Sequence, residues 1–251
     1  MKSRVWKNAA QFLAAVLFLV GVWLVAYSIA GNELIVPSFF DSLKEVGRLL
    51  ADGAFWNAFF KTLLRVFAAF IPCFIFALIF ALISYLYPVF QGFFSPIISV
   101  IRSTPTMAVV LIILVWAGSG RSPMIVAALS LFPVLYTGIS AAFSGLDSKL
   151  LEMSRVYRVP LKTQICKLYL PTLAPFVAKE SGAALAFGLK LVVSAEVLVR
   201  TAVSLGGMMQ DAKLDTEIPT LFALVTVTAV VGILLECLGS LFARLLSGGA
   251  K

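Results

Sequence analysis

The side chains that could do chemistry are few, because charged residues make up 13% of a 251-residue chain that is 61% hydrophobic. The chain has no histidine, and its three cysteines, Cys73, Cys166 and Cys237, lie far apart and form no Cys-x-x-Cys pair. A zinc site, a disulfide framework and histidine catalysis therefore lack their residues. The GxxxxGK[ST] pattern that holds nucleotide phosphates and the GxSxG pattern of a serine nucleophile are also absent from the sequence. The chemistry that remains is recognition by charge.

Two places in the sequence hold charges suited to such recognition. Segment 147–167 carries five basic and two acidic residues, and Lys190, Glu196 and Arg200 lie at the end of an otherwise apolar run. A lysine inside a membrane span is costly and tends to face an aqueous path or a partner. For Lys190 we weigh path lining, pairing with another span, and snorkelling to the surface. Glu196 and Arg200 are four residues apart, so they form either an ion pair at a helix end or part of a gate.

The elements that position these charges must be membrane helices. A soluble domain carries about a quarter of charged residues, roughly twice the share found here, and the mean hydropathy is +1.03. The net charge of +8 is expected to reflect basic cytoplasmic loops and not nucleic-acid binding. We predict an all-α integral membrane protein with six spans and both termini in the cytoplasm. The spans are expected at about 9–31, 66–87, 103–119, 123–144, 172–199 and 218–243.

The connections between these spans have their own patterns. The first apolar run is too long for a signal peptide, so we expect it to be retained as a span. Segment 33–65 is predicted to hold an outer amphipathic helix, because its apolar residues recur at three- and four-residue spacing. Pro88 and Pro96 predict a partly apolar turn after the second span, and the Gly/Ser/Pro cluster at 118–123 predicts a tight hairpin. Segment 200–217 is expected to be an outer gate loop.

The polar loop 147–170 is predicted to be ordered. Leu151–Tyr157 reads as a short helix, Pro160 breaks it, and a second helical stretch covers Leu161–Tyr169 and ends before Pro171. Met153, Val156 and Tyr157 are expected on one face, with Glu152, Arg155 and Arg158 presenting charge. This pattern suits docking into the groove of another protein. A solvated helix held by anionic lipid headgroups is the alternative.

The same loop resembles the hallmark of the permease subunits of ATP-binding-cassette (ABC) importers. That hallmark is Glu-Ala-Ala, three residues, Gly, nine residues, Ile, one residue and Leu-Pro. This chain has Glu152-Met153-Ser154, Arg158 at the Gly position, and Leu168-Tyr169-Leu170-Pro171. Gly would permit a positive φ that Arg adopts less readily, so Val159-Pro160 is expected to supply the turn.

Within that family the chain looks most like the nitrate, sulfonate and taurine branch, over nearly its whole length. The ordered patches that carry this similarity are Val36-Pro37-Ser38, Thr62-Leu63-Leu64-Arg65, Arg102-Ser103-Thr104-Pro105 with Leu114-Val115-Trp116-Ala117-Gly118, and Ser194-Ala195-Glu196 followed by Ser204-Leu205-Gly206.

The resemblance implies a type I ABC importer permease of the bacterial inner membrane. It implies that loop 147–170 is the coupling segment for a separate ABC ATPase pair, which binds ATP and Mg, and that this chain has no cofactor or catalytic residue. The implied partners are a second permease copy, in a homodimer or with a paralogue, and an extracytoplasmic solute-binding protein. The expected coupling residues are Glu152, Met153, Ser154, Arg155, Tyr157, Arg158, Pro160, Leu161 and Lys162, and the expected path or gate residues are Lys190, Glu196, Arg200, Leu205 and Gly206.

Other functions fit the sequence less well. A secondary transporter needs an inverted repeat and matched broken helices, which the sequence does not show. An intramembrane enzyme would lack a catalytic group, and a structural scaffold would not explain an intramembrane Lys190. The expected solute is small and polar or anionic, of the nitrate, sulfonate, taurine-like or vitamin-precursor class. Glu196 or Glu236 would remove the anion preference if either neutralised Lys190.

Overall fold

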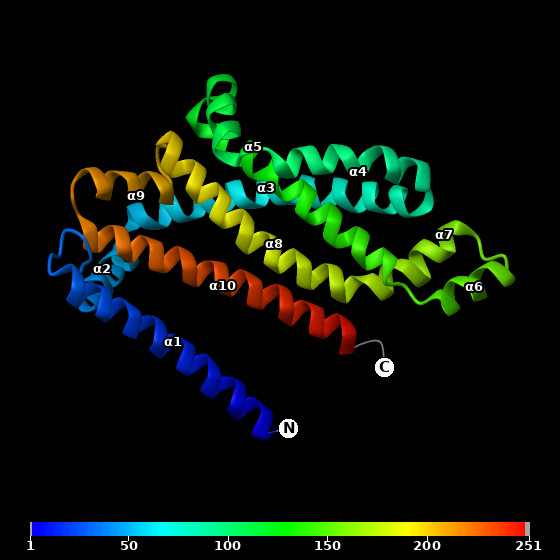
Figure 1. Cartoon of the computed structure of the whole chain (residues 1–251), viewed down its shortest axis with the longest axis horizontal. Helices are drawn as coiled ribbons and strands as arrows, with labels where there is room; N and C mark the ends of the chain where they lie inside the picture. The colour runs from blue at the N-terminus through cyan, green and yellow to red at the C-terminus, as the bar shows by residue number, and fades with distance from the viewer. Residues whose placement is uncertain (1, 249–251) are drawn as a thin grey trace.

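The computed structural model describes residues 2–248, without the side chains of residues 2–10, 12, 13, 148, 151, 155, 247 and 248. All regular elements in this part of the chain are helices, so the expectation of an all-α protein is confirmed for the described residues (Figure 1). They are α1 Lys2–Ala30, α2 Phe39–Ala51, α3 Gly53–Leu86, α4 Pro88–Ser103, α5 Thr106–Ser144, α6 Ser148–Val156, α7 Leu161–Gln164, the π-helix η1 Ile165–Tyr169, α8 Leu170–Val199, α9 Leu205–Leu214 and α10 Ile218–Gly248.

Four helical segments of the described chain are long and apolar enough to cross a membrane. They are Gly53–Leu86, Thr106–Ser144, Leu161–Val199 and Ile218–Leu246, each longer than the roughly 20 residues that a bilayer core requires. Ala14–Ala30 of α1 is a shorter apolar helix. The chain is therefore a multi-pass membrane protein, while six spans and the side of the termini stay predictions.

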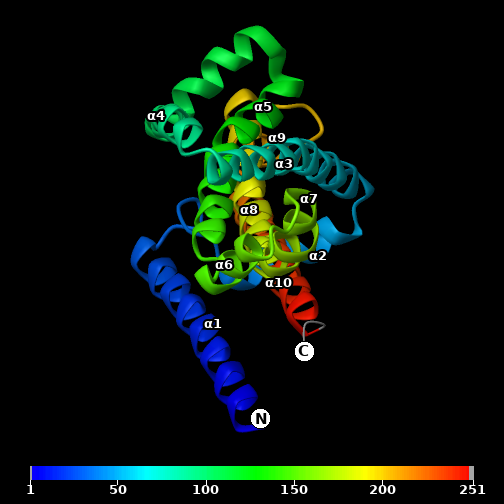
Figure 2. The ribbon, with the colours of Figure 1, turned by 90° about the vertical axis from the view of Figure 1, so that its right-hand side faces the viewer.

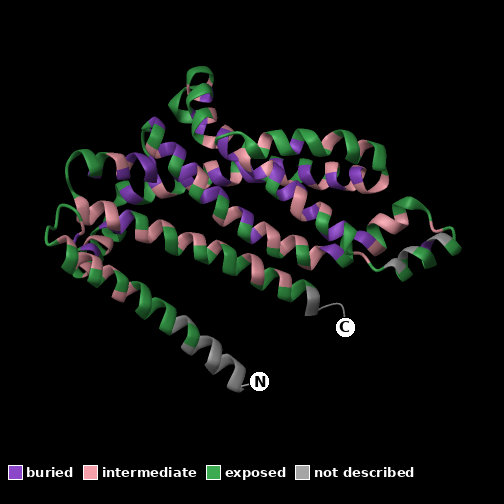
Figure 3. Cartoon of the chain, in the orientation of Figure 1, coloured by how far each residue is buried: buried purple, intermediate pink, exposed green. Residues whose placement is uncertain are grey.

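Helix α8 lies at the centre of the bundle and packs against α3, α5, α9 and α10. Buried residues concentrate where α3, α5 and α8 cross (Figure 3). Small residues permit this packing: a Cβ atom on Gly182 would lie 2.7 Å from the Cα of Gly239 in α10, and one on Gly188 would lie 3.1 Å from Leu131 in α5. The helices therefore approach each other closely at these two glycines.

Helix α1 leans away from this bundle (Figures 1 and 2). Its contacts gather around Trp23, whose indole N–H donates to the Pro37 carbonyl at 3.1 Å and whose ring meets Phe39 and Phe222. Between residues 14 and 30, whose side chains are described, most large apolar side chains are exposed, and Phe18 is 70% exposed. Most of the apolar surface of α1 is thus left uncovered by the chain's own bundle.

The segment expected to be a turn after Leu86 is instead the helix α4, which runs back alongside α3 (Figure 1). Pro88 lies at the first turn of α4, where its missing N–H would have no partner in any case. Pro96 lies inside the helix, as neighbouring helices allow in membrane proteins. The two prolines therefore start and interrupt a helix where the sequence pattern had indicated an irregular turn.

The predicted break at 118–123 is made by one residue. Gly118 has φ 69° and ψ 170°, and helical residues lie directly on either side of it within α5. The hydroxyl of Ser122 donates to the Gly118 carbonyl. Val110 and Ile113 of the first part of α5 belong to the same apolar cluster as Val126 of the second part. The first part of α5 thus folds back on the second at a glycine.

The polar loop projects beyond the bundle at the end that also holds the start of α1 and the end of α10 (Figure 1). Its first helix, α6, agrees with the expected short helix. The second helical stretch does not end before Pro171, because α7 continues through η1 directly into α8. Pro171 lies at the start of α8, where a proline is tolerated. The loop is therefore continuous with the central helix of the bundle.

Candidate functional site

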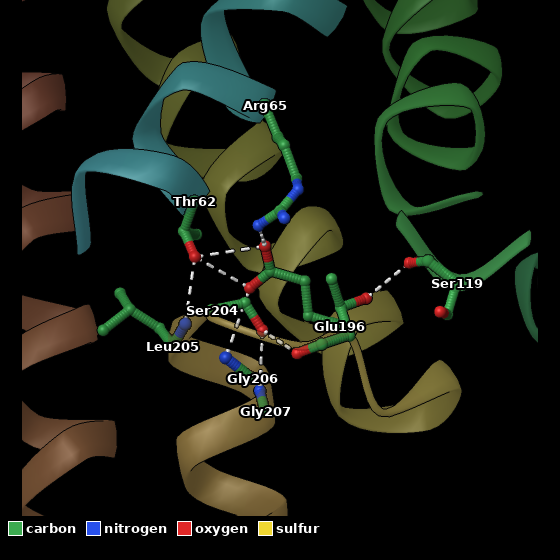
Figure 4. A network of polar contacts seen from close by, with 9 residues as sticks. Thr62, Arg65, Ser119, Glu196, Ser204, Leu205, Gly206 and Gly207 are labelled. Atoms are coloured by element: carbon green, nitrogen blue, oxygen red, sulfur yellow. Dashed lines mark hydrogen bonds and ion pairs between the residues drawn. The ribbon is translucent and has the colours of Figure 1, made fainter. Parts of the chain in front are cut away.

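Helix α8 ends at Val199, far from α6 and α7 (Figure 1), and we use outer end as a label for this end of the helix. A buried carboxylate lies there (Figure 4). Glu196 is fully buried and pairs with Arg65 of α3, with 2.8 Å between Nη1 and Oε1. The hydroxyl of Thr62 donates to Oε2 at 2.9 Å, and the backbone N–H of Gly206 donates to the same oxygen at 3.2 Å. We call Thr62, Arg65, Glu196 and Gly206 the polar lock. It joins three elements that are far apart in the sequence.

The polar lock also fixes the position of α9. Thr62 Oγ1 accepts a hydrogen bond from the backbone N–H of Leu205 at 3.0 Å. Ser204 caps α9 by accepting from the N–H of Gly207 at 2.8 Å. A Cβ atom on Gly206 would lie 2.4 Å from the Cβ of Glu196, so only glycine fits there. The predicted gate loop therefore contains a helix seated firmly on the end of α8.

The turn between α8 and α9 is strained. Arg200 and Val203 have φ of 47° and 48°, in the left-handed region that side chains other than glycine adopt at a cost of about 1–2 kcal/mol. The N–H of Thr201 closes the turn on the Glu196 carbonyl at 3.0 Å. Its hydroxyl donates to the Ser119 carbonyl at 2.7 Å, beside the Gly118 kink of α5 (Figure 4). Contacts to α5 and to the polar lock thus hold the strained turn in place.

The local ion pair considered between Glu196 and Arg200 does not form. Helix α8 ends at Val199, so Arg200 has left the helical geometry in which residues four apart face each other. Its guanidinium pairs instead with Asp211 of α9 at 2.9 Å, and both side chains are more than half exposed. Glu196, Leu205 and Gly206 lie together in one buried network, and Arg200 lies outside it.

Lys190 lies apart from the polar lock. It is exposed and lines a groove of about 580 Å³ between α8, α9, α10 and the start of α5. The polar side chains of Ser194 and Thr228 line the same groove, together with Met107 and Met209. Among the described residues no carboxylate lies within ion-pair distance of Lys190, so neither Glu196 nor Glu236 neutralises it there.

The predicted coupling residues lie on α6, α7 and the turn between them. Met153 and Val156 of α6 and Tyr157 directly after it are 50%, 77% and 76% exposed. Ser154 is buried, and the side chain of Arg155 is not among those that the structure describes. The other coupling candidates are all exposed: Glu152, Arg158, Pro160, Leu161 and Lys162.

Arg158 itself makes the turn that ends α6. Its φ is 49°, and the N–H of Val159 reaches back to the Ser154 carbonyl at 3.0 Å. This is the helix ending in which glycine normally occupies the left-handed position. The expectation that Val159-Pro160 would supply the turn is therefore wrong, because the arginine at the glycine position adopts the glycine conformation.

Sequence reasoning missed several residues of these two regions as site residues. Thr62 and Arg65 were noted only as a family patch, although their spacing of three places both on one face of α3. Gln164 and Tyr169, which hold α7 to the bundle, carried no signal beyond their place in the loop motif.

Comparisons with known proteins agree with this architecture. Residues 74–248 match the family described as "Binding-protein-dependent transport system inner membrane component". A probable ABC transporter permease protein of Brucella melitensis biotype 1 is 25% identical over 211 residues, 82% of this chain and 84% of that protein. SsuC of Bacillus subtilis, named as an aliphatic sulfonates transport permease protein, is 29% identical over 155 residues, 61% of this chain and 54% of SsuC.

The fold has a counterpart among solved structures. A chain of the MetNI methionine ABC transporter in an inward-facing conformation superposes with a TM-score of 0.66 at 15% identity, covering 76% of this chain and 96% of that chain. The family match covers well over half of the present chain, and the fold is that of a permease. The chain therefore belongs to the binding-protein-dependent transport system inner membrane components, the permease subunits of ABC importers.

Proposed function

We propose that this chain forms the solute path of an ATP-driven importer of the bacterial inner membrane. In this proposal a separate ATPase pair docks on α6 and α7, and an extracytoplasmic binding protein delivers the solute. The observation that carries the proposal is the segment α6–α7. It is ordered, basic and partly apolar, and it projects from one end of a membrane bundle (Figure 1).

The arrangement of the helices supports six passes through the membrane. They are α1, α3, α4 together with the first part of α5, the second part of α5, α8 and α10. The start of α1, segment α6–α7 and the end of α10 then lie on one side (Figure 1). Because segment 147–167 has five basic and two acidic residues, this side is the cytoplasm. Helices α2 and α9 lie on the opposite side.

The exposed apolar residues of α6 support docking of a protein there. Met153, Val156 and Tyr157 lie on a helix that extends past the membrane bundle, where apolar surface is costly unless a partner covers it. Lys162 and Arg158 flank this surface, and both are exposed. An apolar patch with a charged rim is the usual composition of a protein interface.

The groove at Lys190 supports the position of the solute path. A lysine in a membrane span that meets no carboxylate among the described residues is expected to face water or a solute. One chain supplies only one wall of this groove, so we propose that a second copy closes it in a twofold arrangement. An exposed cation favours a small polar or anionic solute, and SsuC, which is named for sulfonates, is similar to this chain.

Topology and energy source give the test of this proposal. Single cysteines at positions 45 and 155, in a chain whose three native cysteines are replaced, are labelled with a membrane-impermeant maleimide. We expect label at 45 from outside and at 155 only from the cytoplasmic face. Uptake of taurine and methanesulfonate in vesicles should require ATP and a copurifying ATPase. Uptake driven by an ion gradient without an ATPase would instead identify a secondary transporter.

A further inference from the structure

We infer that Gln164 and Tyr169 form a rigid joint that transmits movement of α6–α7 to three spanning helices. Both are positioning residues, since neither is expected to touch the solute or the ATPase. This inference rests on the proposed function, in which α6–α7 is the docking segment. It adds the side chains through which docking reaches the solute path.

Gln164 ties the docking segment together from within. Its side-chain amide donates to the carbonyl of Val159 at 2.8 Å, directly after the left-handed Arg158. The hydroxyl of Tyr169 donates to the Gln164 amide oxygen at 3.1 Å. One side chain thus links the turn between α6 and α7 to the base of α8. Movement of that turn can therefore reach α8 through the Gln164 side chain.

Tyr169 links this assembly to the bundle. Its ring is only 5% exposed and meets the rings of Tyr85 and Phe143 edge to face, with centroids 5.7 Å and 6.2 Å away. Tyr85 and Phe143 stack on each other at 5.2 Å. Tyr85 lies in the last turn of α3 and Phe143 in the last turn of α5. Three aromatic rings therefore join α3, α5 and the start of α8 at one point.

The backbone at this point is also unusual. Ile165–Tyr169 forms a π-helix, and the N–H of Leu170 reaches the Ile165 carbonyl five residues back. Such turns are rare and occur often at functional sites. The wider turn leaves the chain helical from α7 into α8 while Tyr169 points into the aromatic cluster. A displacement of α7 therefore acts on a continuous helix and cannot be absorbed by a flexible linker.

The outer end of that continuous helix is held by the polar lock. Glu196 joins α8 to α3 and α9, so α8 is fixed at both ends to the elements that must move with it. A shift imposed at Gln164 is carried along α8 past Lys190 to α9. At the joint, side-chain hydrogen bonds reinforce the continuous helix, and at the polar lock they bridge the turn between α8 and α9.

The experiment uses the full chain with its copurified ATPase, with the native cysteines replaced and Lys190→Cys as reporter. The rate of maleimide labelling at position 190 is compared without nucleotide and with MgATP and vanadate. Gln164→Met removes both hydrogen bonds and Tyr169→Phe removes only the hydroxyl. Lys167→Gln, an exposed position in the same π-helix, is the matched control.

We expect the nucleotide-dependent change in labelling to fall about threefold in Tyr169→Phe, which loses one hydrogen bond, and about tenfold in Gln164→Met, which loses two. ATPase copurification and the melting temperature should stay at the level of the Lys167→Gln control. A normal nucleotide-dependent change in labelling in both variants would refute the proposed joint and leave the proposed function standing. Loss of ATPase association in either variant would also overturn it, by making the residue a docking contact. If the unmodified chain retained no ATPase, the proposed function would fall and the joint with it.

Discussion

The two ends of α8 are built on opposite principles. At the outer end, Glu196 is fully buried among hydrogen-bond donors from α3 and α9. At the inner end, the helix continues into a segment whose apolar side chains, such as Tyr157 at 76%, are exposed. A buried charge tolerates little change in its surroundings, whereas an exposed apolar patch is typical of an interaction site. The outer end of α8 therefore fixes a geometry, and the inner end is where we propose that the ATPase docks.

Both ends nevertheless use the same backbone ending. Arg158 after α6 and Arg200 after α8 each take a positive φ, and the N–H of the following residue bonds a carbonyl five residues back. Arg200 is paired with Asp211, while Arg158 is exposed at the docking surface. The same turn thus orients one arginine toward Asp211 of the same chain, and in the proposed function it presents the other to the ATPase.

Breaking the outer end should have the largest effect on stability. Glu196→Ala leaves the Arg65 guanidinium without its carboxylate and removes the acceptor of the Thr62 hydroxyl and the Gly206 N–H. Removing one partner of a buried ion pair costs about 3–5 kcal/mol. We expect a large drop in folded yield and in the melting temperature of the purified protein in detergent.

The control for this variant is Glu217→Ala, an exposed carboxylate just before α10. It should change the free energy of unfolding by less than about 0.5 kcal/mol. Equal melting temperatures for Glu196→Ala and Glu217→Ala would mean that the polar lock does not stabilise the outer end.

Changing the inner end should disturb coupling and leave stability intact. Glu152→Lys places a positive charge beside Arg158 and Lys162 on the exposed docking segment. Since Glu152 is exposed, the free energy of unfolding should change by less than about 0.5 kcal/mol. We expect ATPase association to weaken about tenfold, which equals about 1.4 kcal/mol, and uptake to fall in parallel. A pull-down titration with Glu152→Gln as the milder variant measures this, and wild-type association with full uptake would refute the docking assignment.

The sequence predicted the inner end well for a physical reason. Segment 147–167 is local: its helices, its break at Pro160 and its exposed face follow from residues within a few turns of one another. Met153, Val156 and Tyr157 were expected on one face, and all three are exposed. The left-handed conformation of Arg158 was missed because arginine is uncommon in that region. It becomes evident only once the end of α6 is known.

The outer end escaped prediction because its contacts are distant in sequence. Glu196 and Arg65 are 131 positions apart, whereas Arg200 offered a partner four positions away. No local pattern reveals that α3 crosses α8 at this level. The helix α4 was missed because Pro88 and Pro96 read as breaks, although a proline at the start of a helix does not interrupt it. Long-range packing decided the first feature, and the local position of Pro88 decided the second.

Between the two ends, Lys190 offers a sharper test of the solute path. Lys190→Met keeps an unbranched side chain of similar length and removes the charge. We expect uptake of an anionic solute such as methanesulfonate to fall about fivefold. Association with the ATPase should stay unchanged, because Lys190 lies 20 residues (190 − 170) beyond the start of α8. Lys190→Arg should restore most of the uptake. Unchanged uptake in Lys190→Met, at normal expression, would remove Lys190 from the path and with it the structural reason for an anion.

The smallest expected effect is that of Arg158→Gly, which distinguishes strain in the backbone from binding of the ATPase by the arginine side chain. Arg158→Gly removes a left-handed arginine, which costs about 1–2 kcal/mol, but glycine loses about 0.5–1 kcal/mol more conformational freedom on folding. The net stabilisation should be about 0.5–1 kcal/mol, or a rise of about 1–4 °C in melting temperature. The same substitution at Thr216, whose φ is 61° at the end of α9, should give a similar rise. If the guanidinium of Arg158 contacts the ATPase, Arg158→Gly alone will lower association while Thr216→Gly leaves it unchanged. A fall in melting temperature for both variants would show that these turns are held by contacts of the side chains and are not strained.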